Sequence, residues 1–202
     1  MPRVSEEHLE RRRQQILDAA RVCFIRRGIH ETSMQDIFTE SGLSAGAVYR
    51  YFKSKNEIIE AITVTVIGGL QHFFAEVTSA DPVPPLDEVA ARVTERVVVL
   101  AGETGPVRLA PQAWALALHD PELGRYVREN MSVLRDIWIA YAQRLLEAGH
   151  LPPGTDTAAV GRTLFGLLPG FLLQHLLLGD ITPDDLRAGT RALLRQSMIE
   201  TS

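Results

Sequence analysis

Two short segments with helical apolar spacing, joined by only four residues, constrain this chain more than any other feature. The first begins after Ser33, the second runs from Ala45 to Tyr51, and the residues between them read Ser41-Gly42-Leu43-Ser44. Serine is a favoured N-cap residue and glycine a favoured helix end, so this linker predicts a tight turn between two helices. The lengths of the segments and the glycine at the turn indicate a helix-turn-helix motif.

The remaining sequence also predicts helices. No segment alternates as a strand does between hairpin turn residues, and the long apolar stretches follow helical spacing. We expect an all-α fold of about nine helices, with a three-helix helix-turn-helix head in residues 1–56 and a helical bundle in residues 57–202. The expected helices cover about 5–27, 34–41, 45–51, 55–79, 86–101, 106–118, 121–148, 156–178 and 183–199.

Charge is distributed unevenly along the chain. Residues 1–55 contain ten Arg and Lys against seven Asp and Glu, although the whole chain has a net charge of −4. A cationic head on an anionic body is typical of a DNA-binding protein with a second, separate function. Chance clustering of charges on solvated helix faces is the alternative that charge alone leaves open.

Several other function classes lack their signatures. The sequence has no HExxH, nucleophile-elbow, P-loop or GxGxxG motif, so we expect no catalytic residues and no cofactor. Its six histidines are scattered and its single cysteine, Cys23, lies in an apolar helical stripe, so we expect no metal site. No apolar run is long enough to suggest a membrane span, and no signal peptide is recognised, which predicts a cytoplasmic protein without membrane association.

The segment from Thr32 to Lys55 resembles the TetR family of bacterial transcriptional regulators. The matching residues are Thr32, Ser33, Asp36, Ile37, Ser41, Gly42, Leu43, Ser44, Gly46, Val48, Tyr49, Tyr51, Phe52, Ser54 and Lys55. The resemblance is strong over about residues 11–60 and architectural beyond. It departs at Phe38, where the family more often has alanine, and this larger side chain is expected to displace its helix slightly from its neighbours.

The resemblance implies a set of DNA-contacting residues. They are Ser33, Gln35, Ser44, Ala45, Gly46, Ala47, Tyr49, Arg50, Tyr51 and Lys55. Small residues at the start of the second helix allow close approach to bases, whereas Tyr49, Tyr51 and Lys55 are expected to hold phosphates. Arg50 could read a guanine or neutralise a phosphate. Packing against neighbouring helices is the alternative role for the two tyrosines.

The family also implies a homodimer that binds double-stranded operator DNA and a small apolar effector. Helix 156–178 is apolar around much of its circumference, which dimerisation would bury, although a central core helix would show the same pattern. The expected interface residues are Leu164, Leu168, Phe171, Leu172, His175, Leu193 and Leu194. The expected effector-pocket residues are Phe73, Gln112, Trp114, Asn130, Trp138, Tyr141 and Phe165, each of which could instead be an ordinary core residue.

The sequence therefore predicts a DNA-binding transcriptional regulator, most simply a repressor released from its operator by a ligand. An enzyme is the alternative from another class, disfavoured by the missing motifs. A regulator with a filled core and no ligand is the third possibility, because apolar helices alone do not distinguish a pocket from a core.

Overall fold

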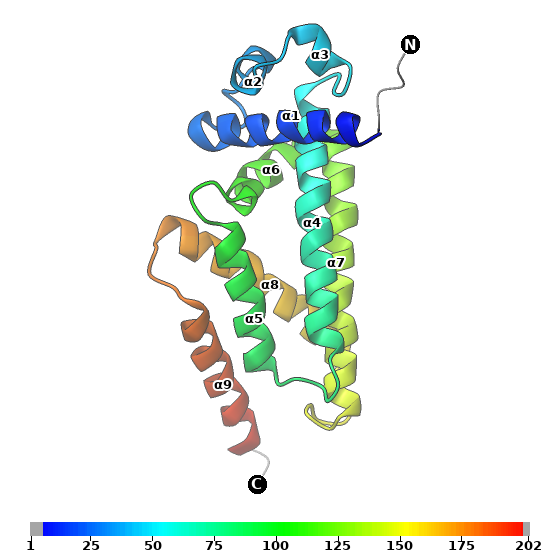
Figure 1. Ribbon diagram of the computed structural model, residues 1–202. Coiled ribbons are helices and arrows are strands. Elements are labelled where there is room, and N and C mark those ends of the chain that lie inside the picture. The colour runs from blue at the N-terminus through cyan, green and yellow to red at the C-terminus, as the bar shows by residue number, and fades with distance from the viewer. Residues whose placement is uncertain (1–5, 200–202) are drawn as a thin grey trace. The chain divides into compact units, whose positions relative to one another are not determined.

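The computed structural model describes residues 6–199, and their side chains as far as residue 194; Ser5, the expected start of the first helix, lies outside the described residues. Over this range the protein is all-α, with nine α-helices, one 3-10 turn and no strand, as the sequence predicts (Figure 1). The elements are α1 (Glu6–Arg27), α2 (Met34–Ser41), α3 (Ala45–Tyr49), α4 (Lys55–Ser79), α5 (Leu86–Leu100), η1 (Pro106–Leu109), α6 (Ala110–Ala117), α7 (Pro121–Glu147), α8 (Thr157–Leu177) and α9 (Pro183–Ile199).

Two of the expected helices are shorter than predicted. The third helix ends at Tyr49 rather than at residue 51. The helix expected over 106–118 is divided into a 3-10 turn and α6, and Pro111 lies in the first turn of α6. Proline lacks a backbone N–H and restricts the preceding residue, so Pro111 fits the first turn of a new helix better than the middle of a longer one.

The chain forms two compact units. The head unit comprises the residues up to Ile67 together with Glu103–Val127, and the body unit comprises Gly68–Gly102 and the chain from Arg128 onward. The head unit is therefore larger than residues 1–56, because it includes the first half of α4, all of α6 and the start of α7. The chain passes between the two units three times, within α4, after Gly102 and within α7.

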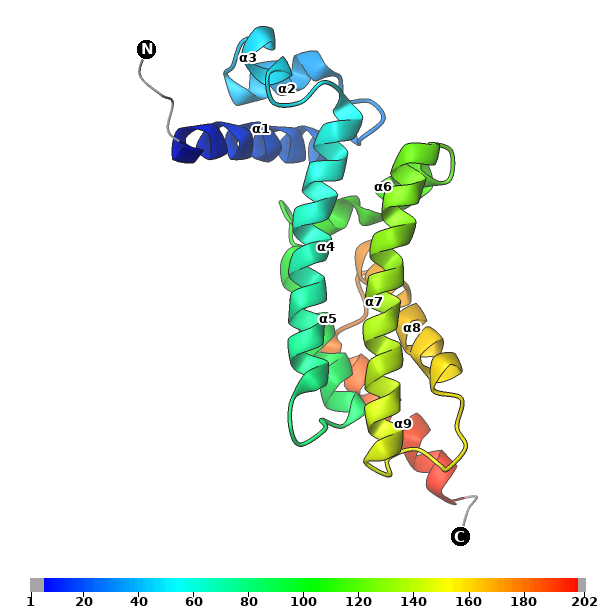
Figure 2. The same cartoon turned by 90° about the vertical axis from the view of Figure 1, so that its right-hand side faces the viewer.

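A single apolar core explains why the segment 103–127 belongs to the head unit. Buried residues of α1, α2, α3 and α4 share one cluster with Leu109, Ala113 and Leu123. In this unit α1 crosses the first part of α4, and α2 and α3 lie together (Figures 1 and 2). Gln112 adds a polar link, because its side-chain oxygen accepts a hydrogen bond from the Ile29 backbone N–H at 2.8 Å.

The body unit is organised around a row of aromatic rings on α4 and α7. Phe74 and Trp138 pack edge to face at 6.1 Å, and Trp138 packs on Tyr141 at the same centroid distance. The Tyr141 hydroxyl donates a 2.7 Å hydrogen bond to the Pro84 carbonyl, and Arg144 donates to the carbonyls of Thr78 and Ala80. These bonds join the end of α4 and the following loop to α7.

Helices α5 and α9 lie side by side in the body unit, as Figure 1 shows. Arg191 of α9 donates from two nitrogens to one carboxylate oxygen of Asp87, which is only 7% exposed at the start of α5. By length and composition alone, α4 and α8 are each apolar enough to cross a membrane. The core helix of a soluble protein passes the same test, so this is weak evidence for a span.

Candidate nucleic-acid interface

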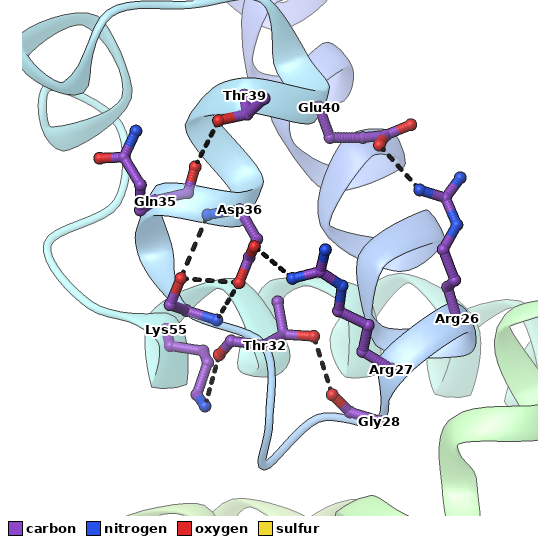
Figure 3. Close-up of polar contacts among 10 residues, drawn as sticks. Arg26, Arg27, Gly28, Thr32, Gln35, Asp36, Thr39, Glu40 and Lys55 are labelled. Atoms are coloured by element: carbon purple, nitrogen blue, oxygen red, sulfur yellow. Dashed lines mark hydrogen bonds and ion pairs between the residues drawn. The ribbon is translucent and has the colours of Figure 1, made fainter.

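A hydrogen-bonded cap fixes the beginning of α2. The Ser33 hydroxyl accepts from the Asp36 backbone N–H, and the Asp36 carboxylate accepts from both the backbone N–H and the hydroxyl of Ser33, at 2.9 and 2.7 Å. This reciprocal pair of bonds is a capping box. Arg27 at the end of α1 also donates to Asp36, at 2.5 Å, so the cap joins the two helices (Figure 3). The hydrogen bonds from Ser33, followed by the Arg27 charge, lower the pKa of Asp36.

The turn between α2 and α3 also forms as predicted. Gly42 adopts a left-handed conformation with φ of 67°, which glycine accommodates without strain, and ends α2. The Ser44 hydroxyl accepts from the Ala47 N–H at 3.3 Å and begins α3. The Gln15 side chain of α1 donates to the Ser41 carbonyl at 2.8 Å and holds the turn against the first helix.

One face of α2 and α3 is left open to solvent. Gln35, Ala45, Gly46 and Arg50 are exposed, and Tyr49 is 42% exposed. Within the described residues the side chains of Gln35 and Arg50 have no hydrogen bond or ion pair, and Figure 3 shows the Gln35 amide turned away from the Asp36 network. These polar groups are therefore available to an external partner.

Three of the expected DNA-contacting residues are engaged inside the protein. The Lys55 ammonium group donates hydrogen bonds to the carbonyls of Ile29, His30 and Thr32, at 2.8, 3.0 and 2.8 Å. An ammonium group has three N–H donors, so none remains for a phosphate, and burial lowers the pKa of Lys55. The Ser33 hydroxyl donates to Asp36, and Tyr51 is half-buried against the head core.

Phe38, the position at which the resemblance departs, lies in the head core. Its side chain is 8% exposed and packs in the cluster shared by α1, α2, α3 and α4, and its effect on the position of α2 stays a prediction. The ring packs edge to face with Tyr49, with centroids 5.3 Å apart and planes inclined at 70°.

The expected effector-pocket residues divide between the two units. Gln112 and Trp114 belong to the head unit, so they do not form one site with the others within a single unit. The remaining five, Phe73, Asn130, Trp138, Tyr141 and Phe165, lie in the body unit. Trp138 and Tyr141 are buried, whereas Phe73 and Phe165 are half-buried. Burial of the Trp138 indole N–H leaves this donor without a partner among the described residues.

The face of α8 that is predicted to form the dimer interface packs against the chain's own residues. Leu164, Phe171 and Leu172 are buried within their own chain, so they cannot supply the surface for a partner. Leu168 and His175 on the same face are half-buried, and His175 stacks on Phe171. Leu193 and Leu194 of α9 are exposed, as the interface requires. The sequence places the expected residues on one helical face but does not say which neighbour covers that face.

The opposite face of α8 holds residues that the expected interface omits. Leu173 and Leu177, four residues apart on that face, are 39% and 76% exposed. Their spacing in an almost wholly apolar helix is a usable signal once the inward face is known. Lys53 is also outside the expected set; it is exposed beside Tyr49 and donates to the Tyr49 carbonyl at 2.7 Å.

A groove of about 540 Å³ lies on the head unit, along α1 and the end of α2. Arg11, Arg21 and Glu40 contribute charged groups to its walls. An open groove with this polar lining does not fit a small apolar ligand, which requires an enclosed and mostly apolar site.

Comparison with known families decides which class of protein has this head. The profile for "Bacterial regulatory proteins, tetR family" matches residues 16–62, and the profile for "BetI-type transcriptional repressor, C-terminal" matches residues 85–198. The chain belongs to the TetR family. It is a transcriptional regulator with a helix-turn-helix DNA-binding region, and the TetR profile covers the capped turn and the open face described above.

Known relatives and solved structures align with most of the length of this TetR-family protein. The uncharacterized HTH-type transcriptional regulator YfiR of Bacillus subtilis is 26% identical over 87% of this chain and 85% of its own length. Salmonella enterica GusR superposes with a TM-score of 0.75 at 22% identity, covering 96% and 100% of the two chains. SmeT in a complex with triclosan superposes with a TM-score of 0.72 at 22% identity, covering 94% and 91%. These structures share the TetR-family fold with this chain.

Proposed function

We propose that this protein is a repressor that binds a palindromic operator as a homodimer and is released by a small apolar effector. The observation that carries the proposal is the open face of α2 and α3, where Gln35 and Arg50 have no internal partner among the described residues. The repressor sense rests on the relatives, because the matching C-terminal profile and SmeT are both named as repressors.

The proposed contacts with DNA divide by chemistry. Ala45, Gly46 and Ala47 at the start of α3 let the backbone approach the major groove, and Gln35 and Arg50 reach base edges or phosphates. Tyr49 and the exposed Lys53 contact the phosphate backbone of the DNA. Lys55 contributes indirectly, by fixing the turn before α2, because its three N–H donors are already bonded to carbonyls of the protein.

The proposed dimer uses the exposed face of α8 together with α9. Leu177 and Leu193 are 76% and 73% exposed in one chain, and an apolar surface of this kind is stabilised by burial against a second copy. Gly166 and Gly170 lie on α8 with open space where a side chain would be, so a partner helix can approach closely. A two-fold dimer presents its recognition helices to half-sites ~34–36 Å apart.

The proposed effector binds in the body unit near the aromatic row. Phe73 and Phe165 are half-buried, and the unpaired indole N–H of Trp138 costs about 1–3 kcal/mol unless an acceptor satisfies it. An apolar molecule with one hydrogen-bond acceptor would satisfy it. Triclosan, the ligand named in the SmeT complex, is the first probe.

Three passages of the chain between the units would transmit the effector's action. An effector bound in the body unit changes the distance between the two heads of the dimer only under one condition. It must bind more tightly to the arrangement of the dimer that does not fit DNA than to the one that does. The segment 103–127 is fixed to the head core and connects to the body unit at both ends, so it supplements α4 as a connection.

A regulator without an effector is the second candidate. It is favoured by the Tyr141 hydroxyl and the Gln112 side chain, which already have partners inside the protein. A thermal-shift screen that begins with triclosan, followed by DNA-release measurements with each hit, separates the candidates. Compounds that raise Tm and release DNA support the proposal that an effector controls DNA binding. Compounds that raise Tm but leave DNA affinity unchanged contradict it.

A further inference from the structure

The aromatic pair formed by Phe38 and Tyr49 links the two helices of the helix-turn-helix motif. Phe38 lies near the end of α2 and Tyr49 ends α3, and their ring centroids are 5.3 Å apart in an edge-to-face arrangement. This geometry is the favourable one for two aromatic rings, because the positive edge of one meets the negative face of the other.

The two members of the pair have different surroundings. Phe38 is 8% exposed and packed in the head core, whereas Tyr49 is 42% exposed. The Phe38 carbonyl also accepts hydrogen bonds from the Leu43 backbone N–H at 3.3 Å and from the Ser41 hydroxyl at 3.1 Å. Phe38 is therefore held by the core and by the turn, while Tyr49 depends on its neighbours for a fixed orientation.

Helix α3 gives Tyr49 little support of its own. It contains only five residues, which is too short to be stable without tertiary contacts. The Lys53 ammonium donates to the Tyr49 carbonyl at 2.7 Å and so holds the backbone, but this bond does not restrain the tyrosine ring. Within the described residues, the only aromatic contact of the Tyr49 ring is with Phe38.

We propose that Phe38 is a positioning residue that holds the Tyr49 ring in the orientation in which its hydroxyl meets DNA. The inference rests on the proposed contact between Tyr49 and the operator. Ordering a free side chain on binding costs affinity, so a ring already fixed by Phe38 binds more tightly than a mobile one. The size of this cost predicts about three- to tenfold weaker DNA binding for each of the dimer's two Tyr49 rings when the Phe38 ring is lost.

A double-mutant cycle on the full-length dimer tests the inference. Phe38→Leu removes the aromatic edge but keeps an apolar core side chain, and Tyr49→Phe removes only the hydroxyl that would touch DNA. We expect each single variant to weaken binding to the operator duplex, and Phe38→Leu to have less than a twofold effect when Tyr49→Phe is already present. Ile37→Val, in the fully buried position beside Phe38, shows how much affinity follows from head stability alone.

The possible outcomes separate three claims. Equal effects of Phe38→Leu with and without the Tyr49 hydroxyl would overturn the positioning role while leaving the Tyr49 contact intact. An unchanged affinity for Tyr49→Phe would remove both the contact and the positioning role. If the wild-type dimer binds no operator at all, the proposed function itself fails. A loss in Phe38→Leu no larger than that of an equally destabilised Ile37→Val would assign Phe38 to the core only.

Discussion

The ammonium nitrogen of Lys55 lies 2.8 Å from the carbonyl oxygen of Ile29, which joins the first turn of α4 to the end of the α1 region. The same nitrogen donates to His30 and Thr32, so one side chain satisfies three carbonyls in the turn that leads into α2. These carbonyls lie in the turn between α1 and α2, outside either helix, and an ammonium group is a strong donor for them. Lys55 therefore sets where the open face of α2 begins.

Replacing Lys55 by methionine should destabilise the head. The variant keeps the apolar stem but leaves three carbonyls without a donor, and loss of charged hydrogen bonds predicts about 2 kcal/mol lower unfolding free energy. Lys53→Met is the control, because its ammonium is exposed and holds one carbonyl. Chemical denaturation of both variants checks the prediction. Equal stability of the two variants would show that the three bonds at Lys55 contribute nothing.

Gly161 should not tolerate even one added methyl group. A Cβ at this position of α8 would lie 2.6 Å from the backbone of Ile139 on α7, so one helix would have to move. Gly161→Ala is expected to lower the unfolding free energy by about 1–3 kcal/mol, the usual range for overpacking. Gly69→Ala, where the same atom would meet open space, should stabilise α4 by up to about 1 kcal/mol. Thermal unfolding of the pair tests this, and a loss of stability in Gly69→Ala similar to that in Gly161→Ala would contradict it.

The local features of the head could be predicted from the sequence. Ser33 and Ser44 cap helices and Gly42 ends one, since capping and left-handed glycine depend on the residue and its immediate neighbours. The same holds for Ser54, whose hydroxyl accepts from the Glu57 N–H at 3.2 Å. The Glu57 carboxylate, however, accepts from the Lys53 N–H rather than from that of Ser54.

Long-range partners could not be predicted in this way. Helix α8 is apolar on several sides, so its sequence does not reveal that Leu164 and Phe171 face the chain's own core while Leu177 faces outward. Gln112 has the amide of a possible ligand contact, but it bonds to Ile29, 83 residues earlier in the chain. Lys55 has the charge of a phosphate contact, and the nearby carbonyls take all its donors. Each of these outcomes depends on tertiary packing.

Leu177 offers the clearest test of the dimer. It is 76% exposed in one chain, so Leu177→Glu should fold normally but place an unpaired charge in the proposed interface. We expect light scattering to show monomers, with helical content unchanged by circular dichroism. Leu118→Glu, directly after α6 in the head unit and at a position that is 83% exposed, is the matched control and should remain dimeric. An intact dimer in Leu177→Glu would place the interface elsewhere.

Asp36 should make the head less stable in acid. Hydrogen bonds from Ser33 lower its pKa in the folded protein, so its charge stabilises the fold above the unfolded pKa, about 3.9, and this contribution is lost as the pH falls through the folded pKa. Asp36→Asn is therefore expected to lower Tm at pH 7 and to approach the wild-type Tm as the pH falls below about 4. Glu40→Gln, which breaks only the exposed pair with Arg26, should change Tm little. A Tm difference between Asp36→Asn and wild type that does not vary with pH would contradict the assignment.

Arg50 should affect DNA binding without affecting the fold. Its side chain is exposed and has no partner among the described residues, so Arg50→Ala is expected to leave Tm unchanged. If Arg50 reads a base, the variant loses about 1–3 kcal/mol of preference at one position of each half-site. If it binds a phosphate, affinity falls for all sequences alike. Selection from a randomised duplex library distinguishes the two, and wild-type affinity and preference in Arg50→Ala would exclude Arg50 from the interface.

Binding of the purified dimer to duplex DNA from upstream of its own gene, measured by fluorescence anisotropy over a range of salt concentrations, tests the central claim most directly. The structure predicts tighter binding to a palindromic fragment than to unrelated DNA. It also predicts an affinity that falls by about 10- to 100-fold between roughly 50 and 200 mM salt, because Lys53, with or without Arg50, neutralises phosphates in both subunits and releases counterions. No preference for any genomic fragment, or an affinity independent of salt, would contradict the claim that the open face of α2 and α3 binds operator DNA.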